Sequence, residues 1–327
     1  MESHQSGPKR VKLMTQARMA MRARHFSVRT QQAYLGWIRR FILFHGKRHP
    51  AALGELEIVQ FLTDLADARS VSRSTHNQAA SALLFLYKEV LGREITKPPA
   101  SFRPTQPRRL PVVLTVDEIK AVFRQLAGPK LLVVRLLYGS GLRVLECMNI
   151  RIKDIDLARR ELQVRGGKGD YDRITMLADS VIPDLEHQIE QVKERHKRDL
   201  GLKRGYVELP GALARKYPNA PRELPWQYLF AAKTRIKSAS LGVKVRHPMH
   251  PSVVQRAVRD AAHAAGMTKR VTCHSFRHSF ATHLLQSGYD IRTVQELLGH
   301  KSVKTTMVYT HVLNRGGRGV RSPADFL

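Results

Sequence analysis

Two clusters near the C-terminus combine side chains that can bind a phosphate and attack it. Residues 273–283 read Cys-His-Ser-Phe-Arg-His-Ser-Phe-Ala-Thr-His, and residues 297–311 read Leu-Leu-Gly-His-Lys-Ser-Val-Lys-Thr-Thr-Met-Val-Tyr-Thr-His. They supply cationic and hydrogen-bonding groups for a phosphate, and a phenol that could attack it: His274, Arg277, His300 and Tyr309. On a chain as basic as this one, the expected phosphate is that of DNA.

The spacing of these residues fits such a site. His274 and Arg277 are three residues apart, so on a helix they share one face. His300 follows Gly299, close to a turn and a helix N-terminus where anions bind well. A phenol is mostly neutral at pH 7, so Tyr309 would need a positively charged site in order to attack. Taken singly, each residue also has a structural explanation: a surface ion pair, a core or loop histidine, or a packed tyrosine.

Two earlier segments add candidate cations. The turn at 139–142, Gly-Ser-Gly-Leu, can aim Arg143, and Glu146 lies three residues further on, where it can buttress the arginine. Lys168 lies among glycines in segment 166–172, the tip of a predicted hairpin. Neither glycine pattern has the spacing of a dinucleotide-binding or ATPase loop. A solvated turn lysine is the alternative for Lys168.

The histidines of residues 273–283 also raise the alternatives of a metal site and a thiol nucleophile. Metallopeptidases use two histidines four residues apart, with a glutamate directly after the first. Here His274 and His278 have that spacing and His283 follows, but Ser275 takes the glutamate's place. Arg277 would also repel a metal ion. Cys273 does not face the same way as its neighbour on a helix. The sequence therefore predicts no metal.

Composition points to a polyanionic partner. The chain has 327 residues, a formal net charge of +29, a pI of about 10.8 and two cysteines. Such a charge favours nucleic acid over a basic surface that serves solubility alone. Cys147 and Cys273 form no disulfide framework, which favours a reducing compartment and makes the bacterial cytoplasm, with its nucleoid, the expected location. No apolar run reaches the ~18 residues of a membrane span.

The first part of the chain is predicted to be helical. Apolar residues recur at steps of three and four over residues 34–42, 58–65 and 79–90, and the N-terminal segment is basic, as expected of a helix that faces DNA. Five prolines between residues 98 and 111 prevent a helix there. We therefore expect a helical domain at 1–97, an extended basic linker at 98–111 and a second domain at 112–327.

The second domain is predicted to be mostly helical with a small sheet. Thr115 and Glu118 form a capping-box pair before an apolar helix. Segments 161–165 and 173–177 alternate like the two strands of a hairpin, whereas residues 201–250 show no regular pattern. Helices are expected at 131–138, 142–150, 183–200, 252–265, 274–287, 291–298 and 303–313.

The order of the candidate residues resembles the tyrosine recombinase (phage integrase) family. The resemblance covers nearly the whole chain and consists of Gly-Leu-Arg143-x-x-Glu146, a hairpin-tip Lys168, His274-x-x-Arg277, Leu-Gly-His300 and Tyr309. It implies a two-domain, C-shaped DNA clamp, mainly α with a small β-sheet in the catalytic domain. The first domain would be a SAM-like core-binding domain. Many members carry a second lysine in the hairpin, where this chain has Tyr171.

The resemblance also implies a role for each residue. Arg143 and Arg277 would grip the scissile phosphate, and His274 and His300 would hydrogen-bond it, with His274 assisting proton transfer. Lys168 would protonate the leaving 5′-oxygen. Tyr309 would attack and form a 3′-phosphotyrosine link, so that neither ATP, metal nor another cofactor is needed.

A finer resemblance is to integron integrases. An insertion at about 203–230 contains Gly-Tyr-Val-Glu-Leu-Pro and Trp226-Gln-Tyr-Leu-Phe, which most recombinases of this class lack. The resemblance implies four protomers on two sites, one of them a folded single-stranded hairpin with extruded bases. Trp226, His247 and Pro248 are the residues it implies as base contacts; loop packing is their alternative. The rival functions are a duplex-specific recombinase for chromosome-dimer resolution or phage integration, a type IB topoisomerase, and a catalytically silent DNA-binding regulator.

Overall fold

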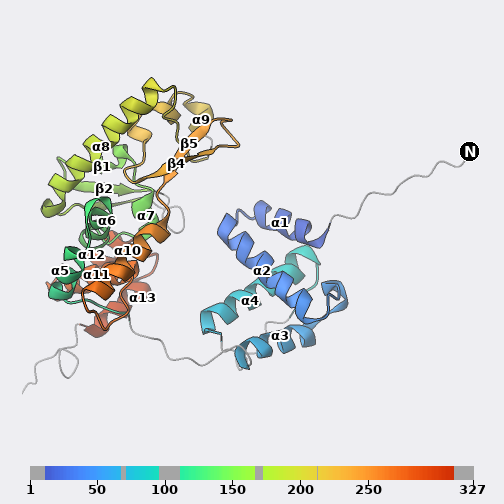
Figure 1. The fold of residues 1–327 in the computed structure, drawn as a ribbon. Coiled ribbons are helices and arrows are strands. Elements are labelled where there is room, and N and C mark those ends of the chain that lie inside the picture. The colour runs from blue at the N-terminus through green and yellow to red at the C-terminus, as the bar shows by residue number, and fades with distance from the viewer. Residues whose placement is uncertain (1–11, 68–70, 96–110, 166–171, 212, 313–327) are drawn as a thin grey trace, which may run out of the picture. The chain divides into compact units, whose positions relative to one another are not determined.

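The computed structural model describes residues 12–67, 71–95, 111–165, 172–211 and 213–312 (Figure 1). Its contacts divide the chain into two units, Met1–Arg109 and Leu110–Leu327. Residues 96–110, which hold nearly all of the predicted linker, and Lys168 at the predicted hairpin tip lie outside the described residues. None of the described helices is both long and apolar enough to cross a membrane.

The first unit contains helices α1 (Leu13–Ala23), α2 (Val28–Phe44), α3 (Glu55–Asp67) and α4 (Arg73–Phe85), and α4 continues as a π-helical turn, Leu86–Val90. Ser27 and Ser72 cap α2 and α4 by accepting hydrogen bonds from backbone N–H groups. The apolar residues that predicted these helices form one buried core, in which the hydroxyl of Tyr87 donates to the Pro50 carbonyl at 3.0 Å. The predicted helical pattern of this unit is confirmed.

The second unit is mostly helical with two small antiparallel sheets. Its helices are α5 (Val116–Arg124), α6 (Gly128–Gly139), α7 (Val144–Met148), α8 (Ile182–Gly201), α9 (Leu213–Lys216), α10 (Pro251–Ala264), α11 (Cys273–Gln286), α12 (Ile291–Leu298) and α13 (Val303–Thr306). Short 3₁₀ segments are η4 (Ile152–Asp154), η5 (Asp179–Val181), η6 (Ala220–Arg222), η7 (Leu224–Trp226) and η8 (Met307–Val312). The capping box of Thr115 and Glu118 at the start of α5 is present.

One sheet precedes helix α8 in the sequence and the other follows it. Strands β1 (Ile155–Asp156), β2 (Glu161–Val164) and β3 (Arg173–Met176) form the first sheet, in which Val164 pairs with Arg173. Strands β4 (Ala231–Lys237) and β5 (Lys244–Pro248) form the second. The interpretation of residues 201–250 as irregular was therefore wrong for β4 and β5. Strand β4 reads Ala-Ala-Lys-Thr-Arg-Ile-Lys and shows no apolar alternation that would reveal it.

Helix α11 contacts α6, α10, α12 and η8, and Figure 1 shows it among α5, α10 and α12. Thr272 caps it and exchanges hydrogen bonds with Ser275. Phe276 packs in the main core, and Phe280 packs in a second cluster with Leu298 of α12 and Tyr309 of η8. One helix therefore joins the core of the domain to the segment that carries the candidate nucleophile.

The predicted helix at 303–313 is shorter than expected. Helix α13 ends at Thr306, and 3₁₀ turns continue to Val312, so Tyr309 lies in a 3₁₀ segment. The β-branched residues of this stretch, Val303, Thr305, Thr306 and Val308, disfavour a long α-helix because their side chains crowd the preceding turn.

Gly141 permits the close packing of the α6–α7 turn on α11. Its φ is +62°, and a Cβ at this position would lie 2.5 Å from the ring of Phe280 and 3.1 Å from Leu298. Both the left-handed backbone and the lack of space therefore require glycine here.

We expect Gly141→Ala to destabilise the second unit strongly. The left-handed conformation costs roughly 1–2 kcal/mol for a residue with a Cβ, and the clash with Phe280 adds about 1–3 kcal/mol. Gly266→Ala is the matched control, because Gly266 has a φ of +66° but nothing within 4 Å of its Cβ position. Urea denaturation should show a clearly larger loss for Gly141→Ala. Equal losses would mean that the close approach to Phe280 costs nothing.

Candidate active site

Five of the six predicted catalytic residues line one open pocket. Its lining consists of Arg143, His274, Arg277, His278, Gly299, His300, Lys301, Thr305, Val308 and Tyr309. These residues come from four parts of the chain: the start of α7, helix α11, the turn after α12, and the α13–η8 segment. Of the predicted catalytic residues, only Lys168 is not placed, because it lies outside the described residues.

Arg277 is buried and held by backbone carbonyls. Its side chain is 4% exposed, and it donates to the carbonyl of Gly141 at 2.5 Å and to that of Leu298 at 2.7 Å. It also donates to Nε2 of His300 at 3.2 Å. Three of the five N–H donors of the guanidinium are thus committed within the described protein. Burial, followed by the nearby charge of Arg143, lowers the pKa of Arg277, but a guanidinium beside a carboxylate stays charged at neutral pH.

Glu146 is the shared partner of three arginines. It accepts from the backbone N–H of Arg143 at 2.8 Å and from its guanidinium at 2.5 Å. It accepts from both terminal nitrogens of Arg173, at 3.1 and 2.8 Å, and lies 3.7 Å from Nη1 of Arg277. Burial opposes its ionisation, but these hydrogen bonds and charges outweigh burial and lower the pKa of Glu146 to about 2. The buttressing of Arg143 by Glu146 is therefore present, and it extends to two further arginines.

Arg173 is a site residue that sequence reasoning missed. It lies on β3, its side chain is only 10% exposed, and Nε donates to the Leu297 carbonyl at 2.9 Å. A Cβ at Gly299 would lie 2.8 Å from Cδ of Arg173, so glycine after α12 makes room for this arginine. The alternation of apolar and polar residues correctly predicted a strand at 173–177. Nothing in the local pattern indicated that an arginine on that strand would be buried against Glu146.

The hydrogen bonds of His300 fix its tautomer. A guanidinium can only donate, so Nε2 of His300 accepts from Arg277 and carries no hydrogen. Nδ1 then carries the hydrogen and donates to the hydroxyl of Thr306 at 2.9 Å. Burial and the charges of Arg277 and Arg143 lower the pKa of His300 to about 4, in keeping with a neutral ring.

Tyr309 reaches the pocket with its hydroxyl. The residue is 2% exposed, and Oη lies 2.8 Å from Nδ1 of His278. The Tyr309 ring stacks on His300 with the centroids 6.4 Å apart and the planes 13° from parallel. Burial raises the pKa of Tyr309, while Arg277 and Arg143 oppose this rise. His274, which is exposed on α11, has a pKa lowered by burial and then by Arg277.

The three predicted base-contacting residues lie in the segment from η7 to β5. Trp226 ends η7 and is half-buried, with Nζ of Lys153 3.2 Å from its ring centroid. His247 and Pro248 end β5 and are also half-buried, and Pro248 pairs with Ala231 of β4. A base that stacked on the covered face of Trp226 would have to displace the ammonium of Lys153.

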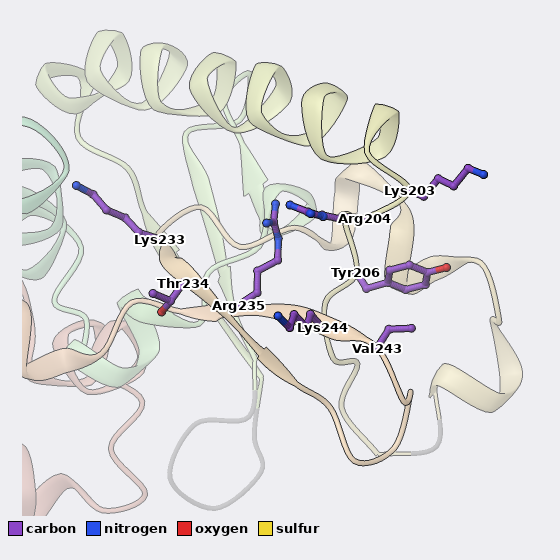
Figure 2. A pocket seen from close by; sticks show the side chains of 8 residues that line it. All are labelled: Lys203, Arg204, Tyr206, Lys233, Thr234, Arg235, Val243 and Lys244. Atoms are coloured by element: carbon purple, nitrogen blue, oxygen red, sulfur yellow. The ribbon is translucent and has the colours of Figure 1, made fainter.

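A second pocket, strongly basic, lies beside these strands. Figure 2 shows its lining residues at the turn after α8 and on and beside β4 and β5: Lys203, Arg204, Tyr206, Lys233, Thr234, Arg235, Val243 and Lys244. No carboxylate is among these lining residues. Asp199, which is buried at the end of α8, forms ion pairs with Arg235 and, at 2.6 Å, with Arg246. The lining itself carries five cationic side chains and no carboxylate, so the pocket has an excess of positive charge.

Comparison with protein families gives two adjoining matches. Residues 113–315 match the Phage integrase family, and residues 13–97 match the N-terminal SAM-like domain of phage integrases. Together the two matches span both units.

Known proteins of similar sequence carry corresponding names. An "Integrase/recombinase" of Escherichia coli is 49% identical over 317 residues, covering 97% of this chain and 94% of that protein. The "Tyrosine recombinase XerA" of Pyrococcus furiosus is 33% identical over 260 residues, covering 78% of this chain and 76% of its own.

Two solved structures share the fold. A lambda integrase dimer bound to a core site matches with a TM-score of 0.63 at 18% identity, covering 95% of this chain and 98% of the other. The XerH site-specific recombinase in a post-cleavage complex with its difH substrate matches with a TM-score of 0.62 at 21% identity, covering 92% and 81%. At this identity the likeness establishes the mainly helical, two-domain fold.

Glu146→Gln tests the central carboxylate through the pH dependence of stability. A carboxyl whose pKa is lowered on folding stabilises the protein above its unfolded pKa of about 4.5, and this contribution is lost as the pH falls toward about 2. The shift corresponds to about 3 kcal/mol. Chemical denaturation should therefore show a loss of about 3 kcal/mol at pH 7 that shrinks to less than half of this value near pH 3.

Asp117→Asn is the control for Glu146→Gln, because the Asp117 side chain is 94% exposed and its ion pair with Lys120 spans 3.8 Å. It should change stability little at either pH. A loss for Glu146→Gln that stayed constant with pH would contradict the assignment of Glu146 as the ionised partner of the arginines.

Proposed function

Because the chain belongs to the phage integrase family and is a tyrosine-type site-specific DNA recombinase, we propose that Tyr309 is its nucleophile. Oη of Tyr309 would attack the scissile phosphorus and form a 3′-phosphotyrosine bond while the bond to the 5′-oxygen breaks. Attack by the freed 5′-hydroxyl of another strand would reverse the step. The energy of the phosphodiester is kept in the covalent intermediate, so the cycle needs no ATP.

Arg143 and Arg277 are the proposed ligands of the scissile phosphate. Arg277 is held rigidly by two carbonyls, and Arg143 has a side chain 24% exposed at the same pocket. Cations that are positioned before the reaction stabilise the charge that develops in the transition state without reorganising. The loss of one such donor commonly costs about 10²–10³ in rate.

His274, His300 and Lys168 complete the proposed site. His274 lies near the start of α11, where it is exposed at the pocket, and would hydrogen-bond the phosphate. His300 would do the same once the negative charge of the phosphate brings a proton onto Nε2, because the tautomer described above carries its only N–H on Nδ1. Lys168 would reach the phosphate from the β2–β3 connection and protonate the leaving 5′-oxygen.

The observation that carries the proposal is the meeting of Tyr309 with two guanidiniums and the imidazoles in one pocket. A buried tyrosine of the core would have its hydroxyl among packing side chains. Here the hydroxyl is hydrogen-bonded within the cationic pocket instead. The proposed nucleophile and the groups proposed to stabilise its transition state therefore line one pocket.

We further propose that the enzyme moves integron gene cassettes, with four protomers on two sites, one of them a folded single-stranded hairpin. Each protomer supplies one Tyr309, and exchange of both strands between two sites requires four cleavages. Support for the hairpin comes from the insertion, where half-buried Trp226 has the cations of Arg151 and Lys153 at its ring and is followed in sequence by strand β4, which lines a strongly basic pocket. Aromatic faces and cations are the groups that hold unpaired nucleotides.

A duplex-specific recombinase is the second candidate. The 33% identity with an enzyme named tyrosine recombinase XerA over 260 residues favours it. The two candidates differ in the DNA they prefer, so binding and cleavage of a hairpin site and of its perfect duplex separate them.

Tyr309→Phe should bind DNA as the wild type does but form no covalent adduct. Without Oη there is no nucleophile, whereas the cations that hold the phosphate remain. The measurement is covalent trapping on nicked duplexes, followed by denaturing gel electrophoresis. Tyr138→Phe is the control, because Tyr138 is also hydrogen-bonded to a histidine of α11, His283, at 2.9 Å. Strand exchange that persisted in Tyr309→Phe would refute the nucleophile assignment.

Trp226→Ala should weaken binding to a hairpin site more than binding to its perfect duplex. Stacking on an aromatic ring contributes about 1–3 kcal/mol for each unpaired base, and a perfect duplex offers no extruded base. Tyr289→Ala, which removes a 54% exposed aromatic residue elsewhere, should affect neither site. Gel-shift titrations of both DNAs measure the difference. An equal loss on both sites would return Trp226 to a packing role.

A further inference from the structure

His278 is the imidazole that none of the roles above uses. It follows Arg277 on α11, is half-buried and lines the same pocket as the proposed nucleophile. Nδ1 of His278 lies 2.8 Å from Oη of Tyr309, and the ring centroids are 5.5 Å apart. The hydroxyl oxygen that would attack DNA is therefore already hydrogen-bonded to an imidazole, which can act as a proton acceptor.

The other two imidazoles of the pocket do not have this contact. Both nitrogens of His300 are engaged, one by Arg277 and the other by Thr306. The His300 and Tyr309 rings are nearly parallel with their centroids 6.4 Å apart, and no hydrogen bond joins these two side chains among the described residues. In the described part of the chain no hydrogen bond joins His274 to Tyr309. His274 instead adjoins His278, with the ring centroids 5.9 Å apart.

We propose that His278 is a catalytic residue that accepts the phenolic proton of Tyr309 during cleavage. The inference rests on the proposed nucleophile and adds the group that activates it. As the Oη–phosphorus bond forms and the bond from phosphorus to the 5′-oxygen breaks, the proton of Oη passes to Nδ1 of His278. The leaving oxygen receives a separate proton from the proposed acid, Lys168. No oxidant or co-reactant is involved.

Rejoining uses the same groups in reverse. The incoming 5′-hydroxyl attacks the phosphorus, the bond to Oη breaks, and the His278 imidazolium returns its proton to Tyr309 as the phenol leaves. The 5′-hydroxyl loses its proton to the group that served as acid in cleavage. The enzyme therefore ends each cycle with His278 neutral and Tyr309 protonated.

The protonation states in the resting pocket suit this role. Burial, then the charges of His274 and Arg277, lower the pKa of His278 to about 4, so its ring is neutral at pH 7 and keeps a lone pair. Burial also raises the pKa of Tyr309, so its phenol does not ionise by itself. A phosphate brought into the pocket adds negative charge near the ring, which favours the imidazolium that forms during attack.

The test needs a DNA that the wild-type protein cleaves. A library of nicked duplexes with a random central segment is incubated with the full-length protein, and DNA that becomes covalently attached is recovered and sequenced. The enriched nicked duplex is the probe, because its short 5′-hydroxyl strand diffuses away and the adduct accumulates. No adduct with the wild type would refute the proposed function, an outcome distinct from any difference among the variants below.

The variants His278→Phe and His278→Asn distinguish two possible roles of His278: accepting the proton of Tyr309 and positioning its hydroxyl. Phe keeps the ring shape, whereas Asn places a hydrogen-bonding atom close to the position of Nδ1 but is not a base. If His278 accepts the proton, both variants should form the adduct about 10²-fold or more slowly at saturating protein, with unchanged DNA affinity. A wild-type rate in either variant would overturn the proposal, and rescue by Asn alone would assign His278 to positioning.

Two further measurements keep the result specific. His283→Phe removes the matching histidine–tyrosine hydrogen bond of the same helix and should keep the wild-type rate, which controls for helix stability.

A probe with sulfur in place of the bridging 5′-oxygen has a leaving group that needs no proton. The defect of the His278 variants should persist on this probe. Recovery of the rate there would place His278 on the leaving-group side and contradict the inference.

Discussion

One buried carboxylate, Glu146, makes the arrangement of the site possible. Arg143, Arg173 and Arg277 all bond to it or lie within ion-pair distance. Two like charges about 4 Å apart repel by roughly 4 kcal/mol at the effective dielectric constant of a protein surface. Three guanidiniums could not stay together without a common counterion. With Glu146 present, the cluster retains two positive charges, which match the two negative charges of a pentacoordinate phosphorane in the proposed reaction.

Backbone carbonyls convert this charge cluster into a defined geometry. Gly141 ends one turn with its carbonyl on Arg277, and Leu298 ends α12 with its carbonyl on the same guanidinium. Neither carbonyl can approach unless the chain packs closely around α11, which is why a Cβ at Gly141 would overlap Phe280. The close packing of these segments around α11 therefore also fixes the orientation of Arg277. A guanidinium anchored in this way loses little entropy on binding a phosphate.

The features that depend on local sequence pattern were predicted correctly. The features that depend on contacts between distant segments were not. Apolar spacing and caps located the helices around the site, and the i, i+3 spacing placed His274 and Arg277 on one helix. Arg173 and His278 were not predicted as site residues, because their roles come from Glu146 and Tyr309, which lie far away in sequence. Strands β4 and β5 were missed because their sequences, Ala-Ala-Lys-Thr-Arg-Ile-Lys and Lys-Val-Arg-His-Pro, show no apolar alternation.

The 3₁₀ segment that carries Tyr309 is held by apolar packing against Phe280 and Leu298 and by contacts with the site itself. Thr306 at the end of α13 hydrogen-bonds His300, the Tyr309 ring lies on that imidazole, and the phenol bonds to His278. The residues that would hold the phosphate therefore also hold the nucleophile. His300 links the two functions most directly, since it bonds Arg277 on one side and Thr306 on the other. Hydrogen bonds thus connect Arg277 through His300 to Thr306, three residues before Tyr309, so the guanidinium proposed to hold the phosphate and the segment that carries the proposed nucleophile belong to one network.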